Sequence, residues 1–328
     1  MYIRRDIEPR VIWFFSWKPL LLYLIISTVA YTLYIHGKVA ALAIPFLPVA
    51  TIGTAVAFYV GFKNNASYER LWEARKIWAE LEHISRFFAM IVAKEHSIDS
   101  KKQSLIYRQL AWLNCVRIQL RQRATFHDVS MEELSHVKIA VERRKEADAT
   151  EEMRAMLVQF VDDDEMNLVL AKRNVATQLL FQQAVALDSL KDVLKAEDYA
   201  KILDTINSCS QQQAAAERIN SFPFPRQYAY MSTLFVNIFI VLLPFSLIGE
   251  LFKNDPKLAW LTIPFSMLIS WVFYTMEKVG DTSENPFENG INDVPMAAIC
   301  REVEIDLRTM LNEKEIPSPL EAVDSILL

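Results

Sequence analysis

Four long stretches without a charged residue constrain this chain most strongly. They span Leu20–Ile35, Val39–Phe62, Gln227–Gly249 and Leu258–Met276, with 16, 24, 23 and 19 residues. Because about 20 apolar residues in a helix cross the hydrocarbon core of a bilayer, these runs predict four transmembrane helices. The shortest run has Trp17 and Tyr34 at its ends, and such rings favour the membrane–water interface.

The charged residues are concentrated outside these runs, so a substantial soluble part is also expected. The chain is 52% hydrophobic and 23% charged, and its longest charged stretch lies between the second and third runs. Apolar residues there recur at helical spacing, without strand-like alternation. We therefore expect an all-α membrane protein with an interfacial segment and two transmembrane helices in 1–63, a cytoplasmic helical domain in 64–226, two more transmembrane helices in 227–277, and a cytoplasmic helix and tail in 278–328.

The orientation follows from the basic residues near the N-terminus. The segment up to Lys18 is mixed basic and aromatic, as expected of a segment lying at the bilayer surface. Its basic residues are Arg4, Arg5, Arg10 and Lys18. Four spans place both termini on one side, and the positive-inside tendency makes that side cytoplasmic. The expected location is the inner membrane of a bacterial cell, with membrane lipids around the spans.

No pattern of residues indicates an enzyme. The chain lacks G-x-S-x-G, a glycine-rich phosphate loop and H-E-x-x-H, and its five histidines have no ligand spacing. The three cysteines lie far apart and are expected to be idle thiols. An acidic run, Asp162 to Glu165, is expected to cap a helix and not to bind a cation. We predict no catalytic residue, no cofactor and no metal, and the net charge of −5 does not favour nucleic-acid binding.

Two stripes lie on the stretch Thr51–Arg75, which we expect to form one helix running from the membrane into water. Gly53, Ala57 and Gly61 recur every four residues, a spacing of small residues that lets membrane helices approach closely. Thr54, Phe58 and Phe62 form a second, bulkier stripe. Such a stripe either lines a narrow apolar constriction that gates ions by dewetting, or faces lipid or protein core. Periodicity alone favours the second alternative.

A resemblance to a known family favours the pore. The segment GFKNNASYERLWEAR, which ends at Arg75, resembles the signature that follows the pore helix in bacterial bestrophin homologues. Phe222–Tyr228 (FPFPRQY), Leu242–Glu250 (LLPFSLIGE) and Glu284–Pro295 (ENPFENGINDVP) resemble three further family segments in the same order. The chain is thereby identified as a member of the bestrophin family, whose members are homopentameric ion channels.

The resemblance assigns roles to individual residues. It implies a pore neck formed by Thr54, Phe58 and Phe62, although the family usually has Ile at the first position, so a hydroxyl would make that ring easier to wet. Counting back from Pro225 implies a cytoplasmic aperture at Ile206. The stripe of Gly53, Ala57 and Gly61 is then expected to pack between neighbouring subunits.

The ion and its control are less constrained. Eukaryotic members carry an acidic calcium clasp, but here only Glu288 and Asp293 follow the Pro286-Phe287 motif, too few carboxylates for a calcium site, so calcium gating is not expected. The resemblance implies small monovalent ions, with chloride favoured. A sodium channel and a helical scaffold without conductance remain alternatives. A secondary transporter is disfavoured, because no inverted repeat is visible.

Overall fold

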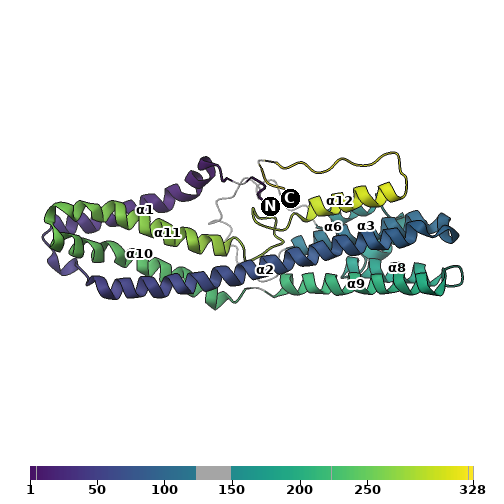
Figure 1. Ribbon diagram of the computed structural model, residues 1–328, viewed down its shortest axis with the longest axis horizontal. Coiled ribbons are helices and arrows are strands. Elements are labelled where there is room, and N and C mark those ends of the chain that lie inside the picture. The colour runs from purple at the N-terminus through teal and green to yellow at the C-terminus, as the bar shows by residue number, and fades with distance from the viewer. Residues whose placement is uncertain (5, 123–148, 223, 324, 328) are drawn as a thin grey trace. The chain divides into compact units, whose positions relative to one another are not determined.

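The computed structural model describes residues 1–328 except 5, 123–148, 223, 324 and 328. The described residues are helical, and their only β pairing consists of isolated bridges that Tyr2 and Val323 make with Ile326. The helices are α1 Pro9–Ile35, α2 Phe46–Lys94, α3 Asp99–Arg121, α6 Ala149–Leu157, α7 Asp163–Leu170, α8 Val175–Asp188, α9 Ala196–Ser221, α10 Arg226–Asn254, α11 Thr262–Asp281 and α12 Met296–Met310 (Figure 1). The all-α class expected from the sequence is confirmed.

Four helical segments are long and apolar enough to cross a membrane, as predicted: α1, α2, α10 and the segment Pro256–Asp281. Two bounds differ from expectation. The basic and aromatic segment after Pro9 forms one continuous helix with the first span. This helix begins at Pro9, a favourable first position because the first amide of a helix has no partner within the helix. Helix α2 has 49 residues, or about 70 Å at 1.5 Å per residue, more than twice the thickness of the hydrocarbon core.

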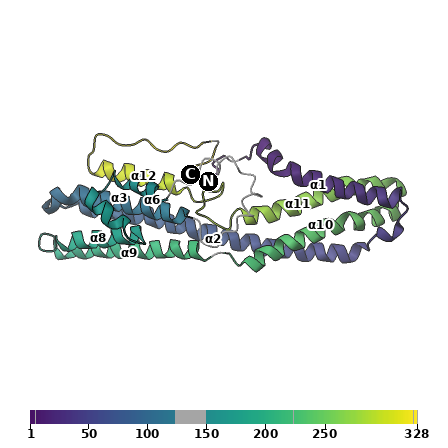
Figure 2. The same ribbon diagram turned by 180° about the vertical axis from the view of Figure 1, so that it is seen from behind.

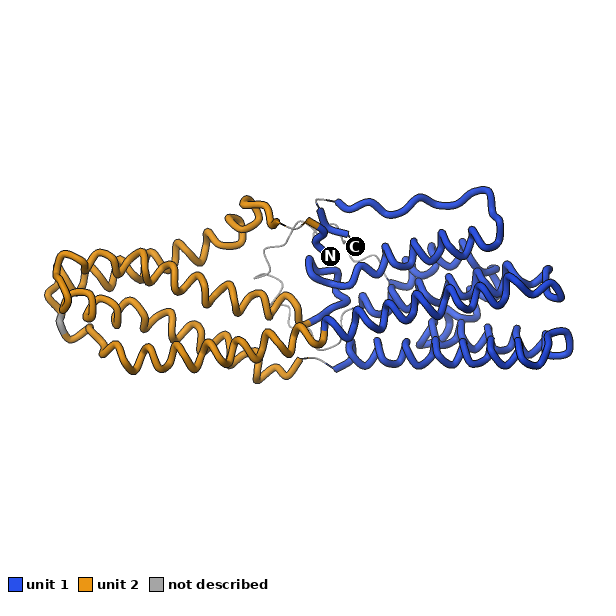
Figure 3. The backbone as a smooth tube through the Cα atoms, viewed as in Figure 1, with its two compact units in different colours: residues 1–3, 71–223, 285–328 blue, residues 4–70, 224–284 orange. Residues whose placement is uncertain are grey.

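The chain divides into two compact units, which Figure 3 shows in different colours. Unit 2 contains residues 4–70 and 224–284, and unit 1 contains residues 1–3, 71–223 and 285–328. Helix α2 contributes its first half to unit 2 and its second half to unit 1. Each unit therefore has its own packing.

Unit 2 has a small apolar core and many polar contacts between helices. Its core joins α2 and α10 through Val56, Val60 and Phe239, while the outward faces of its helices expose large apolar side chains. The hydroxyls of Ser27 and Ser266 share a hydrogen bond of 2.8 Å between α1 and α11. Lipid tails are as apolar as the helices, so close packing and such hydrogen bonds must hold a unit of this kind together.

Unit 1 has a large buried apolar core. Its most buried large side chains include Trp78, Phe88 and Trp112 (Figure 2 shows its helices from behind). Within it, Asp162 accepts a hydrogen bond from the Glu165 amide at 2.8 Å, which confirms the acidic N-cap of α7. The three cysteines are buried and free, and burial raises the pKa of the Cys115, Cys209 and Cys300 thiols to about 12, 12 and 11.

Candidate functional site: the open face of α2 and a buried charge cluster

Thr54, Phe58 and Phe62 lie along one open face of α2. Both phenylalanine side chains are 66% exposed on unit 2. The Thr54 hydroxyl is also on the surface and donates to the Ala50 carbonyl at 3.1 Å. The three side chains therefore do not belong to the core of the subunit.

The opposite face of α2 packs against the rest of unit 2. Val56 and Val60 are buried in the same cluster as Phe239 and Ile240 of α10. At 100° per residue, Val56 points about 200° away from Phe58. Helix packing within the subunit thus fixes α2 with its aromatic stripe turned outward, available to lipid or to other subunits.

The glycine stripe is divided between two environments. A Cβ atom at Gly53 would lie 2.6 Å from Cε2 of Phe239, so the close approach at this position is to α10 of the same chain. This contact gives no support to the expectation that Gly53 packs between subunits. A Cβ at Gly61 would meet no atom within 4 Å, and Ala57 is half-buried. For these two positions packing between subunits stays a prediction.

The predicted aperture residue is oriented inward. Ile206 lies on α9, is 7% exposed and belongs to the apolar core of unit 1, so the single subunit gives no support for an aperture at this residue. The count from Pro225 assumed no gap, and an error of one residue rotates the side chain by 100° around the helix. Three residues earlier, Leu203 is 43% exposed and lies on the open face of α9.

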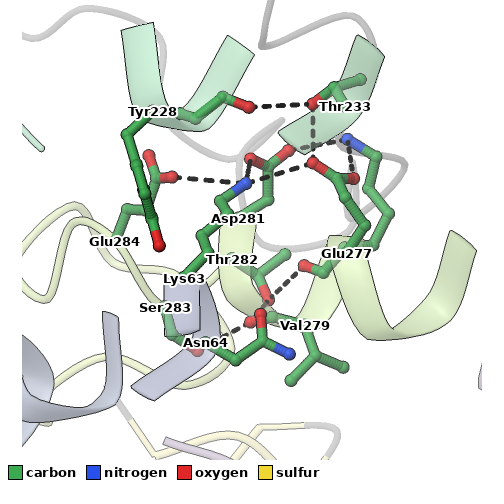
Figure 4. A network of polar contacts seen from close by, with 12 residues as sticks. Lys63, Asn64, Tyr228, Thr233, Glu277, Val279, Asp281, Thr282, Ser283 and Glu284 are labelled. Atoms are coloured by element: carbon green, nitrogen blue, oxygen red, sulfur yellow. Dashed lines mark hydrogen bonds and ion pairs between the residues drawn. The ribbon is translucent and has the colours of Figure 1, made fainter. Parts of the chain in front are cut away.

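The structure also reveals a buried charge cluster that the sequence analysis missed. Lys63, next to Phe62 on α2, is fully buried (Figure 4). Its ammonium group donates to Glu277 at 3.1 Å and to Asp281 at 2.9 Å, and its Nζ lies 3.6 Å from Oε1 of Glu284. Three carboxylates from α11 and the segment after it therefore surround one lysine of α2.

Two further contacts extend the cluster. Thr233 of α10 donates to Glu277 at 2.6 Å, and Lys278 donates to Asp281 at 2.7 Å. The five ionisable groups of this charge cluster are Lys63, Lys278, Glu277, Asp281 and Glu284. With all of them ionised, three negative charges face two positive ones. Removing one partner from a buried ion pair typically costs about 3–5 kcal/mol, so loss of Lys63, Glu277 or Asp281 would destabilise the contact between α2 and α11.

Small side chains allow the helices to meet at this point. Asn64 donates to the Met276 carbonyl at 2.8 Å, and a Cβ atom at Gly280 would lie 2.1 Å from Oδ1 of Asn64. Glu277 and Asp281 are four residues apart, so they share one face of α11. The signal in the sequence is that Lys63 and Glu277 each directly follow an apolar run. Charges at such places usually face water, so the sequence alone does not indicate a buried cluster.

The loop after Phe287 uses its buried acid internally. Asp293 is buried, and its carboxylate accepts a hydrogen bond from the Gly290 amide at 2.7 Å. Burial raises the pKa of Asp293 to about 6, although hydrogen bonds from the loop backbone oppose this. Within the described part of the chain, no three His, Cys, Asp or Glu side chains are grouped to hold a metal. Independence from calcium stays a prediction.

Comparison with known proteins identifies the family. The family model described as "Bacterial/Fungal Bestrophin protein" matches residues 11–309. Voltage-dependent anion channel-forming protein YneE of Escherichia coli K12 is 28% identical over 279 residues, covering 83% of this chain and 79% of the relative. The Ralstonia nicotianae protein RSc3414, which bears the same description, is 25% identical over 325 residues, covering 94% and 95%.

Solved structures agree on the fold. The crystal structure of a bacterial bestrophin homolog from Klebsiella pneumoniae superposes with a TM-score of 0.74, at 22% identity, over 90% of this chain and 98% of the homolog. At that identity the likeness concerns the fold alone. Because the family match spans nearly the whole chain, this protein belongs to the bacterial and fungal bestrophin family.

Proposed function

We propose that this chain is one subunit of a homopentameric, bestrophin-type anion channel. One observation carries the proposal: Phe58 and Phe62 are two-thirds exposed, on the face of an apolar membrane helix opposite to its packed face. An exposed aromatic stripe in that position suits a pore lining shared by several copies of α2. The relatives described as voltage-dependent anion channel-forming proteins support anions as the permeant species.

The proposed neck consists of rings of Thr54, Phe58 and Phe62. Such a constriction carries no charge, so it controls passage by wetting and dewetting. The edges of aromatic rings carry partial positive charge, and edge-on rings at Phe58 and Phe62 favour small monovalent anions such as chloride. The hydroxyl hydrogen of Thr54 is directed to its own helix, which makes this ring less polar than the residue type suggests.

The remaining parts follow from the same proposal. Leu203, exposed on α9, replaces Ile206 as the proposed aperture residue. Gly61 is proposed to contact a neighbouring subunit, since it has open space beside it. We further propose an inner-membrane location with unit 1 and both termini in the cytoplasm, lipid against the exposed apolar faces of α1 and α11, and gating that does not require calcium.

The reversal potential of the purified protein in a planar bilayer under a sodium chloride gradient tests the selectivity. A potential displaced towards chloride is expected. Displacement towards sodium would replace the anion channel by a cation channel. No current from a well-formed oligomer, combined with no current from Phe58→Ala, would favour a scaffold.

The substitution Phe58→Ala tests the neck itself. It removes a side chain that contributes little to the packing of the subunit, so the protein is expected to fold and its single-channel conductance to rise. Phe265→Ala is the matched control, because Phe265 is an exposed phenylalanine on α11, and its conductance should equal that of the wild type. Equal conductance in all three proteins would remove Phe58 from the pore.

A further inference from the structure

The charge cluster around Lys63 is placed where it can control the proposed neck. Lys63 directly follows Phe62, and it is fully buried between α2 and α11. A change in its partners therefore acts on the last turn of α2 that carries a neck residue. The cluster is also bonded to α10 through Thr233, so three membrane helices meet at this one set of charges.

The three acids of the cluster are not equivalent. Glu277 accepts from Lys63 and Thr233, and Asp281 accepts from Lys63 and Lys278. Glu284 is only 14% exposed, and within the described residues its buried Oε1 makes no hydrogen bond, lying 3.6 Å from Lys63. A buried carboxylate with so little compensation is the one that takes up a proton first.

We propose that this cluster is a proton-operated latch on the neck, in which protonation of Glu284 locks α2 against α11 and loss of that proton releases it. The proposal rests on the proposed channel function. With Glu284 neutral, the two lysines balance the two acids Glu277 and Asp281, and α2 is held with Phe58 and Phe62 in the orientation described above. With Glu284 ionised, three negative charges face two positive ones, and the cost of keeping the third carboxylate out of water loosens the contact.

The titration range is physiological. Burial raises the pKa of Glu284 to about 7, against the attraction of Lys63 and with added repulsion from Asp281 and Glu277. A group with this pKa goes from about 9% protonated at pH 8 to about 91% at pH 6. Most of the change in the latch therefore falls within two pH units around neutrality.

Other ionisable groups surround the cluster on each helix that packs against it. On α2 the Arg70 side chain donates to the Glu284 carbonyl at 2.7 Å. Two phenols, Tyr23 of α1 and Tyr274 of α11, interact electrostatically with Glu277. Tyr59 of α2 interacts with Lys63, and Tyr228 of α10 is drawn in Figure 4. Phenols and guanidinium groups ordinarily do not titrate between pH 6 and 8, which leaves Glu284 as the group that changes charge.

Single-channel recording at symmetric pH 6 and pH 8 tests the latch. In the wild type we expect the open probability to fall about fivefold or more at pH 6, because the locked state is about tenfold more populated. Glu284→Gln mimics the protonated acid, so its open probability should be low and equal at both pH values. Glu250→Gln, an exposed acid on α10, is the matched control and should behave like the wild type.

A second measurement does not depend on conductance. The acid ionises at about pH 4.5 in the unfolded chain but near pH 7 in the folded one, so wild-type thermal stability should fall as pH rises from 5 to 7 and then level off. Glu284→Gln should show a smaller fall that ends near pH 6, because Asp293, whose pKa burial raises to about 6, still contributes. If both proteins conduct anions with the same pH dependence, the latch is refuted while the channel stands. If neither conducts, the channel proposal fails, and with it the neck as the target of the latch. Parallel stability profiles of the two proteins would refute Glu284 as the titrating group.

Discussion

Replacing Gly53 by alanine tests whether α2 and α10 meet as closely as the structure shows. The added methyl group would lie 2.6 Å from Cε2 and 2.9 Å from Cζ of Phe239, both well inside contact distance. Phe239 is buried, and its ring centroid lies 4.5 Å from that of Phe273, so the ring cannot move towards Phe273 without displacing it. One of the two helices must shift to accept the methyl group.

Two opposing effects determine how much Gly53→Ala changes the free energy of unfolding. Overpacking a tight contact typically costs about 1–3 kcal/mol. Alanine is favoured over glycine inside a helix by about 1 kcal/mol, which offsets part of that cost. The net destabilisation of Gly53→Ala is therefore about 0–2 kcal/mol, and the central value of about 1 kcal/mol corresponds to a decrease in Tm of a few degrees.

Tryptophan fluorescence of the detergent-purified protein during heating measures this decrease. The double variant Gly53→Ala/Phe239→Leu is the control, since the shorter side chain makes room for the methyl group. In the Phe239→Leu background, adding Gly53→Ala should lower the Tm by much less than it does in the wild type. Such a coupling is expected only for residues in contact. A Tm of Gly53→Ala clearly above the wild-type value, or strictly additive effects in the double variant, would refute the close approach of α2 and α10.

Two further predictions concern unit 1. Oε2 of Glu165 accepts a hydrogen bond from Arg108 at 2.7 Å, and both side chains are nearly buried. Arg108→Met removes this partner, so we expect the free energy of unfolding to fall by about 3–5 kcal/mol. The double variant Arg108→Met/Glu165→Leu should recover most of this stability. A single-variant Tm within one degree of the wild type would contradict this. The three buried thiols should resist alkylation at pH 8 in the folded protein, because their raised pKa values leave little thiolate, and they should react after unfolding in detergent. Mass spectrometry measures the labelling, and rapid labelling of the folded protein would contradict this prediction.

The sequence alone determined the class of the protein and its four spans. An uncharged apolar run of about 20 residues has few alternatives, because in lipid every backbone polar group must be bonded within the segment. It also determined that Thr54, Phe58 and Phe62 share one helix face, since residues four apart always do. The acidic cap at Asp162 was predictable for the same reason, because it depends only on neighbours in the chain.

Only the tertiary structure decided which partner each face meets. Periodicity placed Gly53 in a stripe, but the position of Phe239, 186 residues later, decided that the stripe begins inside the subunit. Ile206 was assigned by counting, whereas the helical phase of α9 against its core turned it inward. Lys63 and Glu277 are separated by 214 residues, and nothing local to either predicts that they meet. A local pattern determines the conformation of a segment, but contacts between distant segments depend on how all the helices pack at once.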